Sequence, residues 1–126
     1  MATVTPTLTL VSTDALVDKL NLSVNKSLTI TGDAIYGSAV MAQGSDFTLS
    51  PKSPTVNTYV YLRNMSTDTT AKGSSNDDID VEFGSTSIAT LAPGEFLFMP
   101  WNGSTGLGMH SIRTGTPTLE YAIFEL

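Results

Sequence analysis

The sequence predicts an all-β fold, an antiparallel β-sandwich of jelly-roll type with an extended N-terminal arm. The main observation is a series of about eight to ten short apolar or alternating segments, separated at spacings of roughly ten residues by Gly, Pro, Asn, Asp and Ser. The composition agrees, because 19 Thr and 14 Ser occur among 126 residues and β-branched Thr suits pleated strands. The one helical pattern, at 12–20, offers only one or two turns and is too short to persist without tertiary contacts.

Length, charge and cysteine content limit the class of protein. A chain of 126 residues fits one domain with a real core, and the absence of cysteine excludes disulfides and thiolate metal sites. The net charge of −6 lies entirely in residues 73–126, and no cluster of Lys and Arg is present to bind nucleic acid. The N-terminal segment resembles no export signal and no apolar run approaches the roughly 20 residues of a membrane helix, so we expect neither. The low charge density suits surfaces that another protein covers.

Residues 1–11 are predicted to form an edge strand or an extended arm, and residues 12–126 a single β-sandwich domain. Thr alternates with apolar residues at period two, and Pro6 lacks the amide donor that a central strand needs. Two interpretations remain open: an ordinary first strand, or an arm that adds itself to the sheet of a neighbouring chain. For the second, the candidate partner-binding residues are Thr3, Val4, Thr5, Pro6, Leu8 and Leu10.

The middle of the chain shows the same alternation with clear turns. Period-two patterns occur at 20–30 and 35–41, and two prolines at 51 and 54 exclude regular pairing after the short segment 47–49. Segment 58–63 is a strand with Tyr59, Tyr61 and Arg63 on one face and apolar residues on the other. The two tyrosines are either half-packed surface or part of an interface patch. A polar loop at 65–78 follows it.

The stretch 91–101 is the predicted centre of the core. Strands at 78–83 and 88–91 lead to a Pro93-Gly94 turn and then to a short strand that is apolar on both faces. Only a central position or a subunit interface hides such a strand. Burial of Trp101 within one subunit would indicate core, and cover of Trp101 by a second chain alone would indicate a subunit interface. Trp101 is a third candidate partner-binding residue beside the two tyrosines.

The C-terminal part completes the predicted sheets. After a Gly-rich loop, a short strand at 109–113 and a turn at 114–117 precede a last strand over 118–126. Both faces of this last strand carry apolar groups, which predicts a position inside its sheet.

No catalytic, cofactor-binding or metal site is predicted. Acidic residues at 77, 78, 80 and 82 could collect calcium, but the segment lacks the glycine and the spaced glutamate of a calcium loop, so a solvated strand face is the preferred interpretation. His110, the sole histidine, has no nucleophile signature near it and is interpreted as structural. Glycines lie in turns and not in a phosphate loop, so an enzyme is not expected.

Several blocks of the second half resemble the small β-rich virion proteins of tailed bacteriophages, particularly cyanophages. The similarity covers 57–126 and rests on the strand 58–64, on 80–84, on the pattern L-x-P-G-E-x-x-x-x-P within 88–101, and on a closing strand that ends E-Y-x-x-F-E at Glu125. This resemblance implies a structural role without catalytic residues.

The resemblance further implies a capsid decoration (cement) protein that binds the outer capsid surface. Such a protein would stabilise contacts between subunits of the major capsid protein, be a homo-oligomer, usually a trimer, and reach the virion after synthesis in the host cytoplasm. It implies that the arm makes the capsid contact, so deletion of residues 1–11 is expected to abolish capsid binding. The alternatives are a minor tail or fibre-associated protein and a carbohydrate-binding β-sandwich with Tyr59, Tyr61 or Trp101 as sugar platforms.

Overall fold

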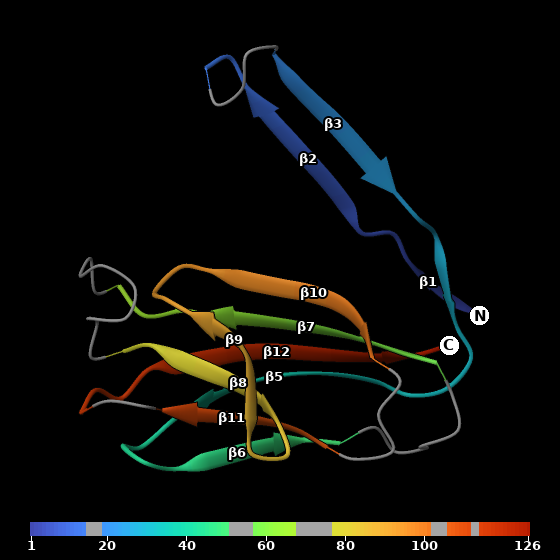
Figure 1. Cartoon of the computed structure of the whole chain (residues 1–126). Coiled ribbons are helices and arrows are strands. Elements are labelled where there is room, and N and C mark those ends of the chain that lie inside the picture. The colour runs from blue at the N-terminus through green and yellow to red at the C-terminus, as the bar shows by residue number, and fades with distance from the viewer. Residues whose placement is uncertain (15–18, 51–56, 68–76, 102–105, 112–113) are drawn as a thin grey trace. The chain divides into compact units, whose positions relative to one another are not determined.

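The computed structural model describes residues 1–14, 19–50, 57–67, 77–101, 106–111 and 114–126 (Figure 1). The regular elements within these ranges are all strands, β1 to β12, and every pairing between them is antiparallel. They fall into two compact units, Met1–Thr31 and Gly32–Leu126. The all-β, antiparallel, sandwich-like fold predicted from the sequence is confirmed.

The first unit is one antiparallel ribbon, and its strands are β1 (Ala2–Val4), β2 (Thr7–Ser12), β3 (Leu20–Asn25) and β4 (Leu28–Ile30). β1 pairs with β4 and β2 with β3 in a single register, because the two numbers of every partnered pair, from Ala2↔Ile30 to Ser12↔Leu20, add up to 32. The ladder is interrupted at Pro6, which accepts a hydrogen bond from the Lys26 N–H at 3.4 Å and has no N–H to return.

The two faces of this ribbon differ in chemistry because side chains alternate along each strand. One face carries hydroxyl and amide groups, with Thr5 opposite Ser27 and Thr9 opposite Ser23, each hydroxyl pair 3.4 Å apart. The other face carries Leu8, Leu10, Leu20, Leu22 and Val24. The ribbon is therefore amphipathic along its whole described length.

The ribbon is larger than the arm expected over residues 1–11. Residues 2–12 take residues 20–30 as their partners, so the compact unit extends to Thr31. The expected edge position of Pro6 fits, because both strands of a two-stranded ribbon are edges. Of the helical turns expected over 12–20, residues 15–18 lie outside the described residues, while Ser12 and Leu20 belong to the strands β2 and β3.

The second unit holds eight strands in two four-stranded sheets, which form two layers in Figure 1. The first sheet has the order β10-β7-β12-β5, with bounds Phe96–Trp101, Thr58–Asn64, Thr118–Glu125 and Ala34–Val40. The second has the order β6-β11-β8-β9, with bounds Asp46–Leu49, Leu107–Ser111, Ile79–Phe83 and Thr86–Leu91. Most strands that follow one another in sequence belong to opposite sheets.

A single apolar core joins the inner faces of the two sheets. On β7 the alternation predicted from the sequence is present, with Val60 and Leu62 buried and Tyr59 and Tyr61 partly exposed. The buried cluster draws on both sheets and contains Met41, Leu49, Val60, Leu62, Ile79, Val81, Leu91, Leu107, Met109, Leu119 and Ile123. The last strand, β12, lies between β7 and β5, which confirms the internal position predicted from its two apolar faces.

The stretch 91–101 forms the expected turn and strand, but at the edge of its sheet. Gly94 has φ of +81° and Glu95 N–H donates to the Ala92 carbonyl at 2.9 Å, the geometry of a type II turn with Pro93 before the glycine. Among the described strands, β10 pairs with β7 alone. Its inner residues Leu97, Met99 and Trp101 pack on the core, and its outer residues Phe96, Phe98 and Pro100 face away from it. The stretch is thus core on one face only.

Asn64 is the polar centre of this core. Its side chain is fully buried, and its amide nitrogen donates to the backbone carbonyls of Asp77 at 2.6 Å and Leu91 at 3.0 Å. Its amide oxygen accepts the Ser66 N–H at 3.1 Å. One side chain therefore connects the end of β7 with the segments that begin β8 and end β9, and so links the two sheets.

Candidate functional site

The outer side of the first sheet is an aromatic surface. Residues that partner one another across β10, β7, β12 and β5 lie on the same face, so the registers place six of the ten aromatic side chains on the side away from the core. We call this set the aromatic face; it comprises Tyr36, Tyr59, Tyr61, Phe96, Phe98 and Phe124. Tyr36 is 72 % exposed and Phe96 60 %. Apolar rings directed out of a sandwich are typical of a docking surface.

The aromatic face has one polar centre, at Glu120. The Tyr36 hydroxyl donates to one carboxylate oxygen at 2.7 Å, and the Tyr61 hydroxyl donates to the other at 3.0 Å. Arg63 is the direct partner of Glu120 on the neighbouring strand. The site thus contains one negative and one positive charge, which leaves the aromatic face without net charge.

The hydrogen bonds of this centre shift three pKa values. The bond from Tyr36, together with the bond from Tyr61 and the charge of Arg63, lowers the pKa of Glu120 against a smaller opposing effect of burial. The same contact with the Glu120 carboxylate raises the pKa of Tyr36 above 10.0. For Tyr61 burial is the largest cause of a raised pKa, followed by its bond to Glu120. Both phenols therefore stay protonated to a higher pH than a free tyrosine.

We expect Glu120→Gln to lower the pKa of Tyr36, and that of Tyr61 by less, because burial of Tyr61 persists when the negative charge is removed. The measurement is the alkaline titration of tyrosinate absorbance, with Tyr36→Phe and Tyr61→Phe backgrounds to assign each phenol. An unchanged titration curve for Glu120→Gln would contradict the contact.

The ring stack at the β10 edge continues the aromatic face. Tyr59 and Phe98 stack with centroids 5.5 Å apart and planes at 26°. Pro100 is the register partner of Tyr59 and extends the same apolar row. The Asn64 N–H on β7 donates to the Glu95 carbonyl at 3.0 Å, so the backbone groups of Glu95 point toward β7. Because backbone groups alternate in direction along an antiparallel strand, the nitrogens of Phe96, Phe98 and Pro100 point away from β7. At Pro100 the free edge therefore has no N–H to offer.

The outer side of the second sheet is polar and carries none of the aromatic residues described above. The His110 ring nitrogen Nδ1 lies 2.6 Å from the Asp46 carboxylate, and Thr90 donates its hydroxyl to Asp80 at 2.6 Å. Ser111 points to the opposite side of the sheet from His110, so the two do not form a nucleophile and base pair. Within the described part of the chain no three His, Cys, Asp or Glu side chains are grouped to hold a metal ion.

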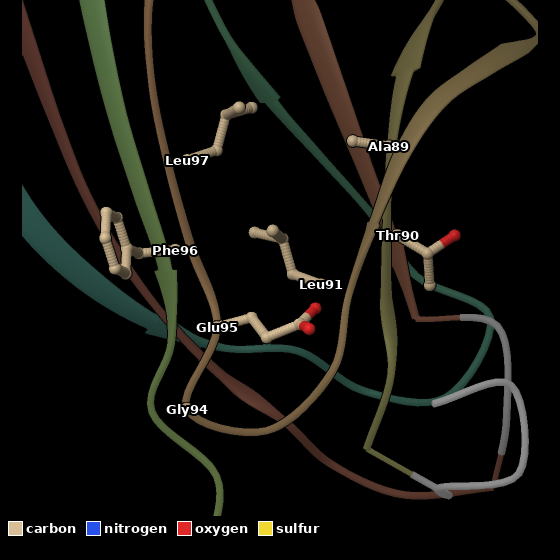
Figure 2. A pocket seen from close by; sticks show the side chains of 7 residues that line it. All are labelled: Ala89, Thr90, Leu91, Gly94, Glu95, Phe96 and Leu97. Atoms are coloured by element: carbon tan, nitrogen blue, oxygen red, sulfur yellow. The ribbon is translucent and has the colours of Figure 1, made fainter. Parts of the chain in front are cut away.

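A shallow depression of about 490 Å³ opens between the edge strands β9 and β10 (Figure 2). Leu91 and Leu97 point into it, and the Glu95 carboxylate at its rim accepts the Ala92 N–H at 3.0 Å. The full lining is Ala89, Thr90, Leu91, Gly94, Glu95, Phe96 and Leu97. With Thr90 and Glu95 as its only polar side chains, the depression lacks the convergent polar groups that orient a small ligand.

The residues predicted as partner-binding fall into three places. Thr3, Thr5, Val4, Pro6, Leu8 and Leu10 lie in the ribbon, the two threonines on the hydroxyl face and the others on the apolar face. Tyr59 and Tyr61 lie together on the aromatic face. Trp101 lies on the inner side of β10, where it packs on the core and meets Phe83 edge to face at 5.5 Å. Trp101 is thus not brought together with the tyrosines.

Sequence reasoning missed the rest of the aromatic face, namely Tyr36, Phe96, Phe98 and Phe124, and the polar centre at Glu120. The sequence did contain a signal within β10, because Phe96 and Phe98 alternate with Leu97 and Met99 and so lie on one face of the strand.

The described residues contain no helix with the length and hydropathy that a membrane span requires. A scan against protein-family models, a search of curated proteins and a search of solved structures each found no match for this chain.

Proposed function

We propose that the chain is a non-enzymatic virion structural protein, a capsid decoration protein of a tailed bacteriophage that binds the outer capsid surface and stabilises contacts between capsid subunits. The observation that carries the proposal is the aromatic face, which directs six aromatic side chains away from the core of its own sandwich. Aromatic residues are enriched, and charges depleted, at the centres of protein interfaces. The geometry therefore best supports a role in which another protein binds the aromatic face.

The strand order supports the finer prediction of a jelly roll. The two sheets have the strand orders β5-β12-β7-β10 and β6-β11-β8-β9. This arrangement agrees with two Greek keys wound into a double sheet. Jelly rolls are used by viral capsid and lectin domains, among others. Because a fold alone does not define a function, the proposal relies on the surface and on the resemblance, and uses the fold only as support.

The proposed partner is the phage major capsid protein, and the proposed state is a homo-oligomer, for which the resemblance predicts three copies. An aromatic surface without net charge fits a protein partner better than a small molecule. Binding of many copies to a repeating shell multiplies a modest affinity of each contact. The site of action would be the capsid surface of the virion.

The test is binding to capsids that lack this protein. The double variant Tyr36→Ala with Phe96→Ala removes the two most exposed rings, and we expect it to weaken co-sedimentation with capsids by roughly a hundredfold, as loss of two interface anchors does. Ile88→Ala is the matched control, because Ile88 is also an exposed apolar residue, 47 % accessible, but lies on the second sheet.

Two results would contradict the proposal. One is equal capsid binding by the double variant and the wild-type chain. The other is a count of only a few copies per virion by quantitative mass spectrometry, which would place the chain in the tail or its fibres.

A second candidate function is carbohydrate binding, which the polar centre favours. Tyr61 and Tyr36 flank an ionised carboxylate, and rings beside an acceptor can stack on a sugar and bind its hydroxyl groups. Glycan binding on an array that Tyr61→Ala abolishes would support this function, with Trp101 no longer a candidate because it faces the core. Absence of any glycan binding would eliminate it.

A further inference from the structure

The strand β5 is the unprotected edge of the sandwich. The two sheets of described strands end in four edge strands, and three of these carry a feature that hinders the addition of another strand. β10 contains Pro100, β6 is only four residues long and begins with Asp46, and β9 has a bulge at Ile88. β5 contains no charge and no proline, and its register with β12 is unbroken over seven pairs. A long apolar edge of this kind is a template for another strand.

Two hydrogen bonds show which backbone groups of β5 face the free edge. The Met41 N–H donates to the Pro117 carbonyl at 2.8 Å, and the Glu125 N–H donates to the Asp33 carbonyl at 2.9 Å. Odd-numbered residues therefore direct their backbone groups toward β12. Because this direction alternates along an antiparallel strand, even-numbered residues direct both N–H and C=O at the free edge. These residues are Ala34, Tyr36, Ser38 and Val40, and all four are exposed.

The side chains of β5 are complementary to the same strand of a second copy. Antiparallel pairing about Gly37 places residues whose numbers add up to 74 opposite each other, and no other antiparallel register of this strand with itself pairs all four outward-directed residues. Each larger side chain then lies opposite a small one of the other copy. The pairs are Ile35 with Ala39, Tyr36 with Ser38, and Val40 with Ala34.

The same register covers apolar surface that a single unit leaves exposed. Ile35 is 42 % exposed on the inner side of β5, and Tyr36 and Val40 are each 72 % exposed on the outer side. Each of these three side chains gains a cross-strand neighbour of small volume, which leaves room for it. An arbitrary partner strand lacks this match of large and small residues, so the edge favours a second copy of the chain.

We propose that two copies of this chain pair their β5 strands antiparallel, about a two-fold axis that passes between their Gly37 residues at right angles to the sheet. The two four-stranded sheets then form one sheet of eight strands, in which the outward-directed N–H and C=O groups of β5 are all hydrogen-bonded. The contact is isologous and uses the one unprotected edge of each sandwich, so it closes at two copies. A trimer of the kind that the resemblance predicts would use a different surface.

The pairing has a consequence for the aromatic face, and in this it goes beyond the proposed function. A two-fold axis at right angles to the sheet keeps the outer sides of both copies on the same side. Tyr36 belongs to β5, so the two aromatic faces join across the axis into one continuous surface. A pair of copies therefore presents two joined docking surfaces, and a repeating partner can bind both at once.

The first test traps the proposed register with a disulfide, in a chain that has no cysteine of its own. Ile35 and Ala39 of the partner subunit form a non-hydrogen-bonded pair, whose Cα atoms lie about 4.5 Å apart, within the range of a disulfide. Ile35→Cys and Ala39→Cys are made in separate chains. In a pair of identical variants the substituted positions lie roughly 13 Å apart, too far for a disulfide.

We therefore expect an oxidised equimolar mixture of the two variants to give a covalent dimer on a non-reducing gel, and either variant alone to give at least tenfold less. A mixture without the covalent dimer, or equal amounts in the mixture and in the single variants, would overturn the proposed register.

The second test removes one backbone donor from the free edge. Ser38→Pro deletes an N–H that faces solvent in the single chain, a change that an edge strand tolerates, but in the pair this N–H donates to the Tyr36 carbonyl of the partner subunit. The pair loses two hydrogen bonds and leaves two carbonyls without donors. We expect self-association in sedimentation velocity to become roughly a hundredfold weaker.

Ser38→Ala is the matched control, because it changes the same side chain and keeps the N–H. It should associate like the wild-type chain. Equal association of Ser38→Pro and Ser38→Ala, or a wild-type chain that stays single at high concentration, would overturn the pairing.

These outcomes are separable from those of the proposed function, because both tests use the purified chain without capsids. The variants at Ile35, Ser38 and Ala39 leave the rings of the aromatic face in place. A mixed disulfide in a chain that fails to bind capsids would support the pairing and contradict the proposed function. Binding to capsids without the mixed disulfide would overturn the pairing alone.

Discussion

Replacement of Asn64 by leucine is expected to lower the free energy of unfolding of the unit Gly32–Leu126 by about 3 kcal/mol, because the buried carbonyls of Asp77 and Leu91 lose their donor and Ser66 N–H loses its acceptor. Leucine has a similar volume, so the loss measures hydrogen bonding and not a cavity. For a unit of this size the midpoint of thermal unfolding should fall by roughly 15 °C. Circular dichroism during heating and urea titration measure both quantities.

Asn57→Ala is the control for this prediction, since Asn57 lies just before β7 with an exposed side chain. Its free energy of unfolding should stay within about 0.5 kcal/mol of wild type. If Asn64→Leu unfolded at the same temperature as Asn57→Ala, the three hydrogen bonds would not hold the two sheets together as described.

Truncation of Leu62 to alanine is expected to cost about 3–4 kcal/mol of unfolding free energy, through lost transfer energy and the cavity that remains. Leu62 is 0 % exposed at the middle of β7, and its register partners are Leu97 on β10 and Tyr121 on β12. Three adjacent strands therefore share its contacts, and neighbours held by two ladders collapse little into the space. Urea unfolding should show a lower midpoint with an unchanged slope.

Ile88→Ala is the aliphatic control for Leu62→Ala, because it removes the same number of carbon atoms from a side chain that is 47 % exposed on β9. Its effect should stay below about 1 kcal/mol. A change as large as that of Leu62→Ala would show that the outer side of the second sheet is covered in solution.

Local patterns in the sequence predicted the individual strands well. Alternation over 58–63 placed Tyr59 and Tyr61 on one face and Val60 and Leu62 on the other, which is the burial observed. The Pro93-Gly94 pair predicted a turn because Gly tolerates the positive φ that the turn requires. Two apolar faces on the last strand predicted its internal position between β7 and β5. Each of these properties depends on residues close together in the chain.

Long-range pairing could not be predicted in the same way. The strand β10 is also apolar on both faces, yet it lies at the edge of its sheet. Its outer rings belong to the aromatic face and do not pack in the core of the unit. The ribbon pairs residues up to 28 positions apart, Ala2 with Ile30, and the alternation of either segment alone is equally suited to a different partner. Strand order is decided by contacts that no single segment contains.

The candidate site was predicted only in part for the same reason. Tyr59 and Tyr61 were identified because they alternate within one strand. Tyr36 and Phe124 come from segments far from β7 in sequence, and they join the tyrosines only when β5 and β12 take their places in the sheet. Glu120 shows this most clearly, because its partners Tyr36 and Tyr61 are 84 and 59 residues away.

The missing N–H of Pro100 has a consequence for aggregation. An exposed apolar edge strand is a template on which strands of other molecules can add and grow into fibres. On β10 an incoming strand would find donors at Phe96 and Phe98 but none at Pro100, so a continuous ladder could not form. This single ring lets the chain keep an aromatic strand at the rim of its sheet, available to a partner that binds side chains, while resisting partners that bind backbone.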